Sequence, residues 1–214
     1  MPAQSLIGIK YSQFRLAIGG GFSYTLAKVP KGLEPTADDY LRSLKSGFHF
    51  RADANYFFNR QFGIGLKYSY FGSKGSVENI RFLDDQGNII HLDISDEISN
   101  NFIGPTFLIR FLGPVNKNAF IVSISMGYMG YKNYAYYGFP FTLNGSTLAM
   151  AIDLGYDIGI SENLSLGFWA TLYFGSLSKL TYDDGFSTET IELSEEQRES
   201  VSRIDLSVIL SFNK

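Results

Sequence analysis

Cysteine is missing from the 214 residues, which excludes a disulfide framework, thiolate metal ligands and a cysteine nucleophile. Histidine is nearly missing as well, because His49 and His91 are the two copies, so there is little material for imidazole chemistry. The formal net charge of −3 shows no basic excess, and a nucleic-acid partner is therefore not expected.

Long apolar runs are also lacking. The longest stretch without a charged residue, 133–152, contains Pro140, Gly138 and Gly145 and cannot form a membrane-spanning helix. The first residues carry neither the basic segment nor the apolar segment of a signal peptide. We expect an exported protein from which the signal peptide has been removed; a cytoplasmic protein is the alternative.

Aromatic residues and glycine are abundant instead. Aromatics make up 16% of the chain, and there are 22 glycines against six prolines. This composition favours twisted β-strands over helices.

The clearest strand pattern lies in the segment 48–70. Phe48, Phe50 and Ala52 alternate with His49 and Arg51, and the same period of two resumes after the turn at 59–61. Alternation of this kind places one row of side chains on each face of a β-sheet. We therefore predict a hairpin here, with one apolar face and one face that carries charges.

The same alternation recurs along the whole chain and predicts eight strands. The connections between them alternate between long and short, as in an up-and-down barrel whose two ends differ. The sequence therefore predicts an all-β fold, an eight-stranded antiparallel up-and-down transmembrane β-barrel with long extracellular loops, in a single domain over 1–214. We assign 1–13 to an N-terminal periplasmic segment and 14–213 to the barrel, with long connections at 28–45, 72–101, 132–146 and 176–201 and short ones at 59–61, 113–118 and 161–163.

Each of the four long connections carries a pattern of its own. Thr36 to Asp39 has the form of a helix N-cap box, which predicts about two helical turns before Lys45. The segment 77–94 predicts a two-stranded ribbon that continues the third and fourth strands, and 180–193 predicts a second ribbon. We interpret 133–145 as a loop rich in aromatic residues.

Two closed barrels fit eight such strands, and they differ in which face meets the surroundings. A soluble lipocalin-like ligand-binding barrel exposes its charged row, whereas a membrane barrel exposes its apolar row to lipid. The apolar rows here contain no charge, and a charge facing lipid at mid-membrane costs about 2–4 kcal/mol. The opposite rows are small and sparsely charged, which suits the narrow lumen of eight strands. We expect a lumen charge network of mutually neutralising residues, namely Arg15, Arg51, Asp53, Lys67, Arg110, Asp153, Asp157, Arg203 and Asp205, with His49 on the same face.

Aromatic residues gather at both ends of the apolar rows. Girdles of this kind mark the two interfaces of a lipid bilayer. We predict membrane-interface positions for Phe14, Tyr56, Phe58, Phe62, Phe111, Phe120 and Phe212 at the short-turn end and for Tyr24, Tyr70, Tyr128 and Phe174 at the other.

These rows resemble the small outer-membrane β-barrel family of Gram-negative bacteria. The segments 48–58 and 62–70 carry the likeness, together with the terminal row from Ile204 to Phe212, which is similar to the signal that the barrel-assembly machinery recognises. The family pattern ends on the aromatic residue, whereas this chain continues through Asn213 and Lys214. The resemblance implies a bacterial outer-membrane location, and the family includes adhesins, structural barrels and a few enzymes.

Candidate catalytic residues are few. His49 with Asp53, and Ser46 beside them, could serve a membrane-embedded lipid-modifying enzyme such as a lipid A hydrolase or acyltransferase, which the resemblance allows. His91 and Asp93 share one face of the first ribbon. The pairs Asp84–Asp85 and Asp183–Asp184 are better explained by turn formation than by metal binding.

The sequence therefore favours a structural role or a surface adhesion and interaction role, without catalysis, cofactor, metal or open pore. The expected partners are outer-membrane lipid and lipopolysaccharide, the barrel-assembly machinery during insertion, and an extracellular partner at the long connections. The lipid-modifying enzyme with a site near His49 is the first alternative, and the soluble ligand-binding barrel is the second.

Overall fold

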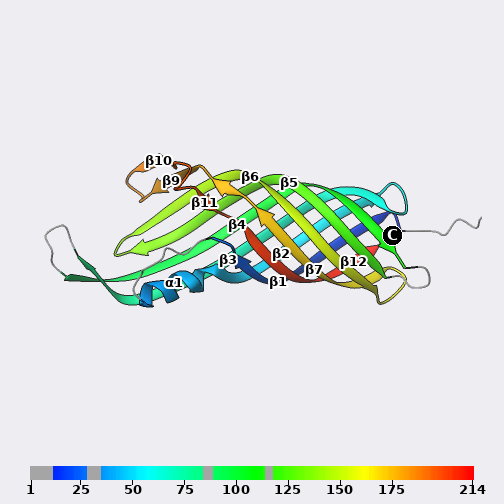
Figure 1. The fold of residues 1–214 in the computed structure, drawn as a ribbon, viewed down its shortest axis with the longest axis horizontal. Coiled ribbons are helices and arrows are strands. Elements are labelled where there is room, and N and C mark those ends of the chain that lie inside the picture. The colour runs from blue at the N-terminus through cyan, green and yellow to red at the C-terminus, as the bar shows by residue number, and fades with distance from the viewer. Residues whose placement is uncertain (1–11, 28–34, 84–88, 114–117) are drawn as a thin grey trace, which may run out of the picture.

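The computed structural model describes residues 12–27, 35–83, 89–113 and 118–214. Strands dominate it, and Figure 1 shows them running side by side and tilted along one elongated body. The helix and the short strands β9, β10 and β11 lie at one end, and the C-terminus lies at the other. The two ends of the barrel therefore differ in structure.

Eight strands form a closed antiparallel ring. Each pairs with its neighbour in sequence, and β1 pairs with β12, which closes the barrel. The predicted eight-stranded up-and-down barrel is confirmed. The ring strands are β1 (Phe14–Thr25), β2 (Ser46–Phe57), β3 (Phe62–Leu83), β4 (Ile89–Leu112), β5 (Ala119–Tyr137), β6 (Pro140–Gly159), β7 (Leu164–Phe174) and β12 (Arg203–Asn213).

In a soluble protein the apolar side chains are buried and the charged ones are exposed, and in this ring the arrangement is reversed. On β2, Arg51 and Asp53 are buried, while Phe48 is 77% exposed and Phe50 47% exposed. The same alternation runs along β12, where Arg203 and Asp205 are buried and Leu206 is exposed. An apolar belt surrounds a charged lumen, as a transmembrane barrel requires.

Glycine permits close approach at two points of this wall. A Cβ atom on Gly21 of β1 would lie 1.9 Å from the carbonyl oxygen of Leu206, so β1 and β12 can pack at this distance only without one. Gly155 lies under the indole ring of Trp169, where a Cβ atom would be 2.1 Å from the ring. The large Trp169 side chain fits inside the narrow lumen because of this glycine.

Pro105 interrupts the ladder between β4 and β5. The pairing passes from Ile103–Tyr128 to Thr106–Ser125 and keeps the same register on both sides. Proline has no N–H to donate, which explains the gap. The constant register shows that no bulge is present at Pro105.

Two of the long connections consist largely of strand. β3 and β4 continue past the belt to Leu83 and from Ile89, which confirms the ribbon predicted over 77–94. The loop predicted at 132–146 is wrong, because β5 and β6 pair up to Tyr136 and Pro140 with a tight turn at Gly138. Tyrosine and phenylalanine favour strands, and this preference outweighed the turn-forming residues in that segment.

The remaining long connections lie at the same end. The one after β7 contains β8 (Ser176–Leu177), β9 (Lys179–Asp183), β10 (Thr188–Glu192) and β11 (Glu199–Ser200). β9 and β10 form the second predicted ribbon, and β9 also pairs with β6. The sheet of the barrel therefore extends well beyond the belt on this side.

The connection after β1 contains α1 (Pro35–Lys45), which begins one residue before the predicted Thr36 cap and is longer than predicted. Pro35 suits the first turn, where its missing N–H has no helical partner to lose. Tyr40 and Leu44 are buried against Ile94 of β4. The helix therefore covers the extended part of β3 and β4. No helix in the described ranges is long and apolar enough to cross a membrane.

Candidate functional site: the charged lumen and the outer end

Asp153 of β6 is the centre of the lumen. Its Oδ1 lies 3.1 Å from Nη1 of Arg51 and also forms a short ion pair with Nζ of Lys67. Ser123 Oγ donates to its Oδ2 at 2.6 Å, and Thr171 Oγ1 donates to Oδ1 at 2.7 Å. This carboxylate, which is fully buried, therefore joins groups from β2, β3, β5 and β7.

Arg51 also neutralises a second carboxylate. Its Nε and Nη2 atoms donate to the two oxygens of Asp53 at 3.0 and 3.1 Å. The two-pronged geometry is the strong form of the arginine–carboxylate pair. Because β2 places Arg51 and Asp53 two residues apart on the inward row, strand alternation alone brings them together.

A second cluster lies nearer the short-turn end. Arg15 Nη2 is 2.9 Å from Asp157 Oδ2, and Trp169 Nε1 donates to Asp157 Oδ1 at 2.8 Å. The Arg15 guanidinium also lies 4.9 Å from the centre of the Trp169 ring. The indole thus contacts both members of the ion pair.

A third cluster lies toward the long-connection end and includes His49. Ser23 Oγ donates to Asp205 Oδ1 at 2.6 Å and lies 2.9 Å from His49 Nδ1. His49 Nε2 is 2.7 Å from Ser207 Oγ. Since the single proton of Ser23 goes to Asp205, His49 donates from Nδ1 and accepts from Ser207 at Nε2. The result is a hydrogen-bonded chain through four buried side chains.

Arg203 completes this third cluster. Its Nε lies 3.0 Å from Asp205 Oδ1, and its Nη2 donates to Ser69 Oγ at 2.9 Å. The guanidinium is 4.0 Å from the centre of the Tyr173 ring. Arg203 therefore links β12 to β3 and packs on an aromatic face in the lumen.

The last predicted lumen charge, Arg110, lies at the short-turn end. Its Nη2 donates to the carbonyl oxygen of Ser12 at 3.0 Å, and its guanidinium lies 3.7 Å from the centre of the Phe57 ring. Arg110 thus binds main-chain oxygen at the barrel's end, away from the Asp153 centre.

Charge is balanced in the middle of the lumen. Four cations (Arg15, Arg51, Lys67, Arg203) face four carboxylates (Asp53, Asp153, Asp157, Asp205), and all eight are at most 6% exposed. Eight strands leave an interior just wide enough for side chains, and here ion pairs and aromatic rings fill it.

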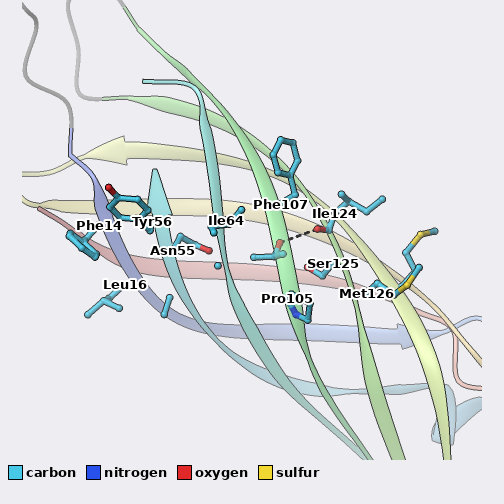
Figure 2. A pocket seen from close by; sticks show the side chains of 14 residues that line it. Phe14, Leu16, Asn55, Tyr56, Ile64, Pro105, Phe107, Ile124, Ser125 and Met126 are labelled. Carbon is cyan, nitrogen blue, oxygen red and sulfur yellow. Dashed lines mark hydrogen bonds between the residues drawn. The ribbon is translucent and has the colours of Figure 1, made fainter. Parts of the chain in front are cut away.

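The outer face carries a broad apolar groove of about 790 Å³ that crosses β1 to β6. Figure 2 shows Phe14 and Tyr56 at one end of it and Met126 at the other, with Pro105 between. Thr106 Oγ1 donates to the carbonyl oxygen of Ile124 at 3.2 Å within it, drawn as a dashed line in Figure 2. The shape and apolar lining of this groove suit acyl chains.

The predicted girdle residues lie on the same outer face as this belt. Each is at least 37% exposed, as expected for side chains that point away from the lumen. Phe14 and Tyr56 are in contact, with ring centres 5.1 Å apart, as are Phe111 and Phe120 at 6.3 Å. Aromatic rings from adjacent strands therefore pair at the short-turn end.

At the long-connection end, Asp96 of β4 fastens the helix to the sheet. Tyr40 of α1 donates a short hydrogen bond to its Oδ2, Tyr137 donates to the same oxygen at 3.0 Å, and Asn133 donates to Oδ1 at 2.5 Å. Burial and the Asp96 charge raise the pKa of Tyr137 to about 12, and the same two causes raise the pKa of Tyr40 further. Both hydroxyls therefore stay protonated donors at neutral pH.

Solved structures with the same architecture come from bacterial outer membranes. A major outer membrane protein from Thermus thermophilus matches with a TM-score of 0.60 and 10% identity, over 96% of this chain and all of the other. OprG from Pseudomonas aeruginosa matches with 0.51 and 11%, over 95% and 97%. The outer membrane protease OmpT from Escherichia coli matches with 0.52 and 6%, over 80% of this chain but 65% of its own.

This chain has the fold of a small outer-membrane β-barrel protein. No protein-family model matches the sequence, and no curated protein matches it either. At these identities the structural likeness shows the fold, so the chemistry must be judged from this barrel's own residues.

The catalytic candidates of the sequence do not come together in the barrel. Asp53 forms its ion pair with Arg51, whereas the His49 ring lies within hydrogen-bond distance of Ser23 and Ser207 and 4.0 Å from Asp205. His91 and Asp93 are exposed on the β3–β4 extension, where Asp93 accepts a hydrogen bond from the main-chain N–H of Asn79.

Ser23 and Ser207 are not among the site residues predicted from the sequence, although the alternation places both on inward rows. Neither residue is unusual among the many inward serines, so no local signal marks them. The Asp96 cluster was missed for another reason, because its members lie in segments predicted as connections.

Metal binding finds no support among the described residues, where no group of three His, Asp or Glu side chains converges. Asp183 and Asp184 accept main-chain hydrogen bonds from Gly185 and Phe186 at 2.9 Å each, as expected for turn formation. The other acidic pair, Asp84–Asp85, lies outside the described residues.

Proposed function

We propose that the protein is an outer-membrane β-barrel that carries an adhesive interaction surface outside the cell and contains no open channel. The observation that supports this best is the contrast between the two parts of the molecule. The lumen is filled by neutralised charges, whereas the sheet continues past the belt at one end and exposes large aromatic side chains there.

These side chains form an aromatic tip on the β5–β6 hairpin and β9. Phe141 is its centre, with ring centres 5.4 Å from Tyr137, 5.8 Å from Phe139 and 5.2 Å from Tyr182. Tyr134, Tyr136 and Phe139 of the same hairpin remain 53%, 43% and 53% exposed. Rigid aromatic side chains on a firm strand scaffold are the residues that dominate protein interfaces. We therefore infer that a protein partner binds at this tip.

Cell adhesion tests this proposal. A non-adherent Gram-negative host expressing the protein should bind immobilised extracellular-matrix proteins, and the triple variant Tyr134→Ser, Tyr136→Ser, Phe139→Ser should lose about tenfold in binding. The matched control is Thr188→Ser, Glu189→Gln, Thr190→Ser on the exposed strand β10. Equal binding by the triple variant and the control at equal surface display would contradict the role of the tip.

Channel activity is tested separately in planar lipid bilayers. The protein refolded in detergent should produce no stepwise conductance, because ion pairs cross the lumen from wall to wall. Regular conductance steps that persist in independent preparations would overturn the closed-lumen part of the proposal.

The lipid-modifying alternative has one observation in its favour. The hydroxyl of Ser207 lies against His49 as its base, and Ser23 connects His49 to the carboxylate of Asp205. A hydroxyl, a base and an acid that orients the base are the groups that activate a nucleophile. A nucleophile must also meet its substrate, and Ser207 is only 6% exposed and points into the filled lumen. We therefore propose a structural role for this chain of hydrogen bonds.

A further inference from the structure

A separate cavity of about 310 Å³ lies beneath α1, where the barrel opens at the long-connection end. Leu41 and Leu44 of the helix, Ile98 of β4 and Val201 provide apolar walls. Its size falls at the lower end of the range for small-molecule sites. An apolar enclosure of this size suits a small ligand better than a protein segment.

Asn100 of β4 is the first polar group in this cavity. The residue is 2% exposed, and its Oδ1 has no hydrogen-bond donor within the described part of the chain. The large majority of buried side-chain polar atoms have a hydrogen-bond partner in the protein or in ordered water. The oxygen can therefore accept a hydrogen bond from a bound molecule.

Glu199 of β11 is the second polar group. The residue as a whole is exposed at the rim, but burial of its carboxylate raises its pKa above the ordinary value. No cation of the described ranges lies within salt-bridge distance of it. Of the other charged or titratable groups that line the cavity, Lys45 of α1 lies over the ring of Tyr24, with Nζ 4.9 Å from its centre.

Tyr131 of β5 is the remaining titratable group on the cavity wall. Burial and the negative charge of Glu199 raise its pKa, so it stays neutral and offers its ring. An aromatic face beside a carboxylate attracts organic cations. The walls thus combine two hydrogen-bond acceptors, the negative charge of Glu199, the positive charge of Lys45 over Tyr24, and apolar surface.

We propose that this cavity binds a small primary amine in its ammonium form, with an apolar body the size of one aromatic ring. The ammonium group donates to Asn100 Oδ1 and to the Glu199 carboxylate, and the body packs against Leu44, Ile98 and Val201. This site is distinct from the aromatic tip and does not depend on the adhesive role.

Binding of 2-phenylethylamine to the refolded full chain in detergent micelles, measured by isothermal titration calorimetry, tests the proposal. The uncharged 2-phenylethanol and the anion phenylacetate have nearly the same shape, and both should bind at least about tenfold more weakly, a loss of about 1.4 kcal/mol. If phenylacetate bound best, Lys45 would determine the ligand class and the proposal would be wrong.

Two variants locate the site. Glu199→Gln should weaken binding of 2-phenylethylamine about tenfold or more, and Glu195→Gln, which changes an exposed carboxylate four residues earlier, should leave it unchanged. Asn100→Leu should also weaken binding, with heat-modifiable migration as the check that the barrel is folded. Unchanged affinity in Glu199→Gln would overturn the proposal.

The pH dependence gives an independent readout. The amine stays charged below pH 8, and the raised pKa of Tyr131 keeps its hydroxyl protonated over the same range. Affinity should therefore be constant near neutral pH and fall as the pH drops through the raised pKa of Glu199, because the protonated carboxyl loses its charge. The Glu199→Gln variant should show no such fall, and a fall of equal size in that variant would contradict the assignment.

Discussion

Arg51 and Asp153 join opposite walls of the barrel. Nη1 of Arg51 on β2 lies 3.1 Å from Oδ1 of Asp153 on β6, and the two residues are 102 positions apart in sequence. In the ring, β2 and β6 are separated by three strands on either side, so this ion pair crosses the full width of the lumen. The lumen is therefore held together from side to side by charge as well as by the ladder around its wall.

The first prediction concerns Asp153. Asp153→Ala leaves Arg51 and Lys67 without their shared carboxylate, and removal of one partner from a buried ion pair costs about 3–5 kcal/mol. The barrel should still close, but the free energy of unfolding should fall by that order. Urea unfolding in lipid vesicles, followed by the fluorescence of the single tryptophan Trp169, measures it.

Glu189→Gln is the control for Asp153. This carboxylate lies exposed on β10, and surface substitutions usually change stability by less than about 0.5 kcal/mol. Equal losses of stability in the two variants would show that the ion pairs across the lumen do not support the fold.

The second prediction concerns the apolar belt. Leu154 of β6 is 50% exposed midway along the outer row, so Leu154→Arg should reduce the stability of the membrane-inserted barrel by about 2–4 kcal/mol. Tyr136→Arg, beyond the belt on β5, should cost about 1 kcal/mol or less. Unfolding in vesicles compares them, and a similar cost at both positions would show that the belt does not face lipid.

The third prediction concerns the attachment of α1. Asp96→Ala removes the acceptor shared by Tyr40, Asn133 and Tyr137, and α1 should then open more often from the sheet. Trypsin should cleave faster after Arg42, which is exposed, while the heat-modifiable migration of the barrel stays unchanged.

Glu97→Gln is the matched control on the same strand. Its exposed side chain lies 3.6 Å from Lys74, and an exposed pair of this kind contributes little to stability. Cleavage in this variant should match the unmodified protein. Identical cleavage in Asp96→Ala as well would rule out Asp96 as the anchor of the helix.

The fourth prediction separates a structural His49 from a catalytic one. His49→Ala leaves the hydroxyls of Ser23 and Ser207 without the imidazole between them, which should lower stability by about 1–3 kcal/mol. Mass spectrometry of lipid A should show no difference between cells that express the unmodified protein and cells that express the His49→Ala variant. Loss of a lipid A modification in His49→Ala cells, with normal levels of folded protein, would favour the enzyme alternative.

Local patterns in the sequence determined the barrel. Alternation in segments such as 48–58 fixes which side chains share a face, and the lengths of the connections separate the two ends. The first signal depends on the strand period and the second on turn-forming residues. Both are local, because each is carried by residues that are close together in the sequence. For the same reason the inward position of Arg51, Asp53 and Lys67 could be predicted one strand at a time.

Tertiary structure alone decided which of these residues meet. The register of eight strands places Arg51 against Asp153 and Ser23 against Asp205, and register accumulates around the ring in a way that no single segment encodes. The extension of β5 and β6 also depends on pairing, because strand partners stabilise 132–146 where local turn residues predicted a loop. The cavity under α1 also depends on tertiary structure, since its walls come from segments that only the closed barrel brings together.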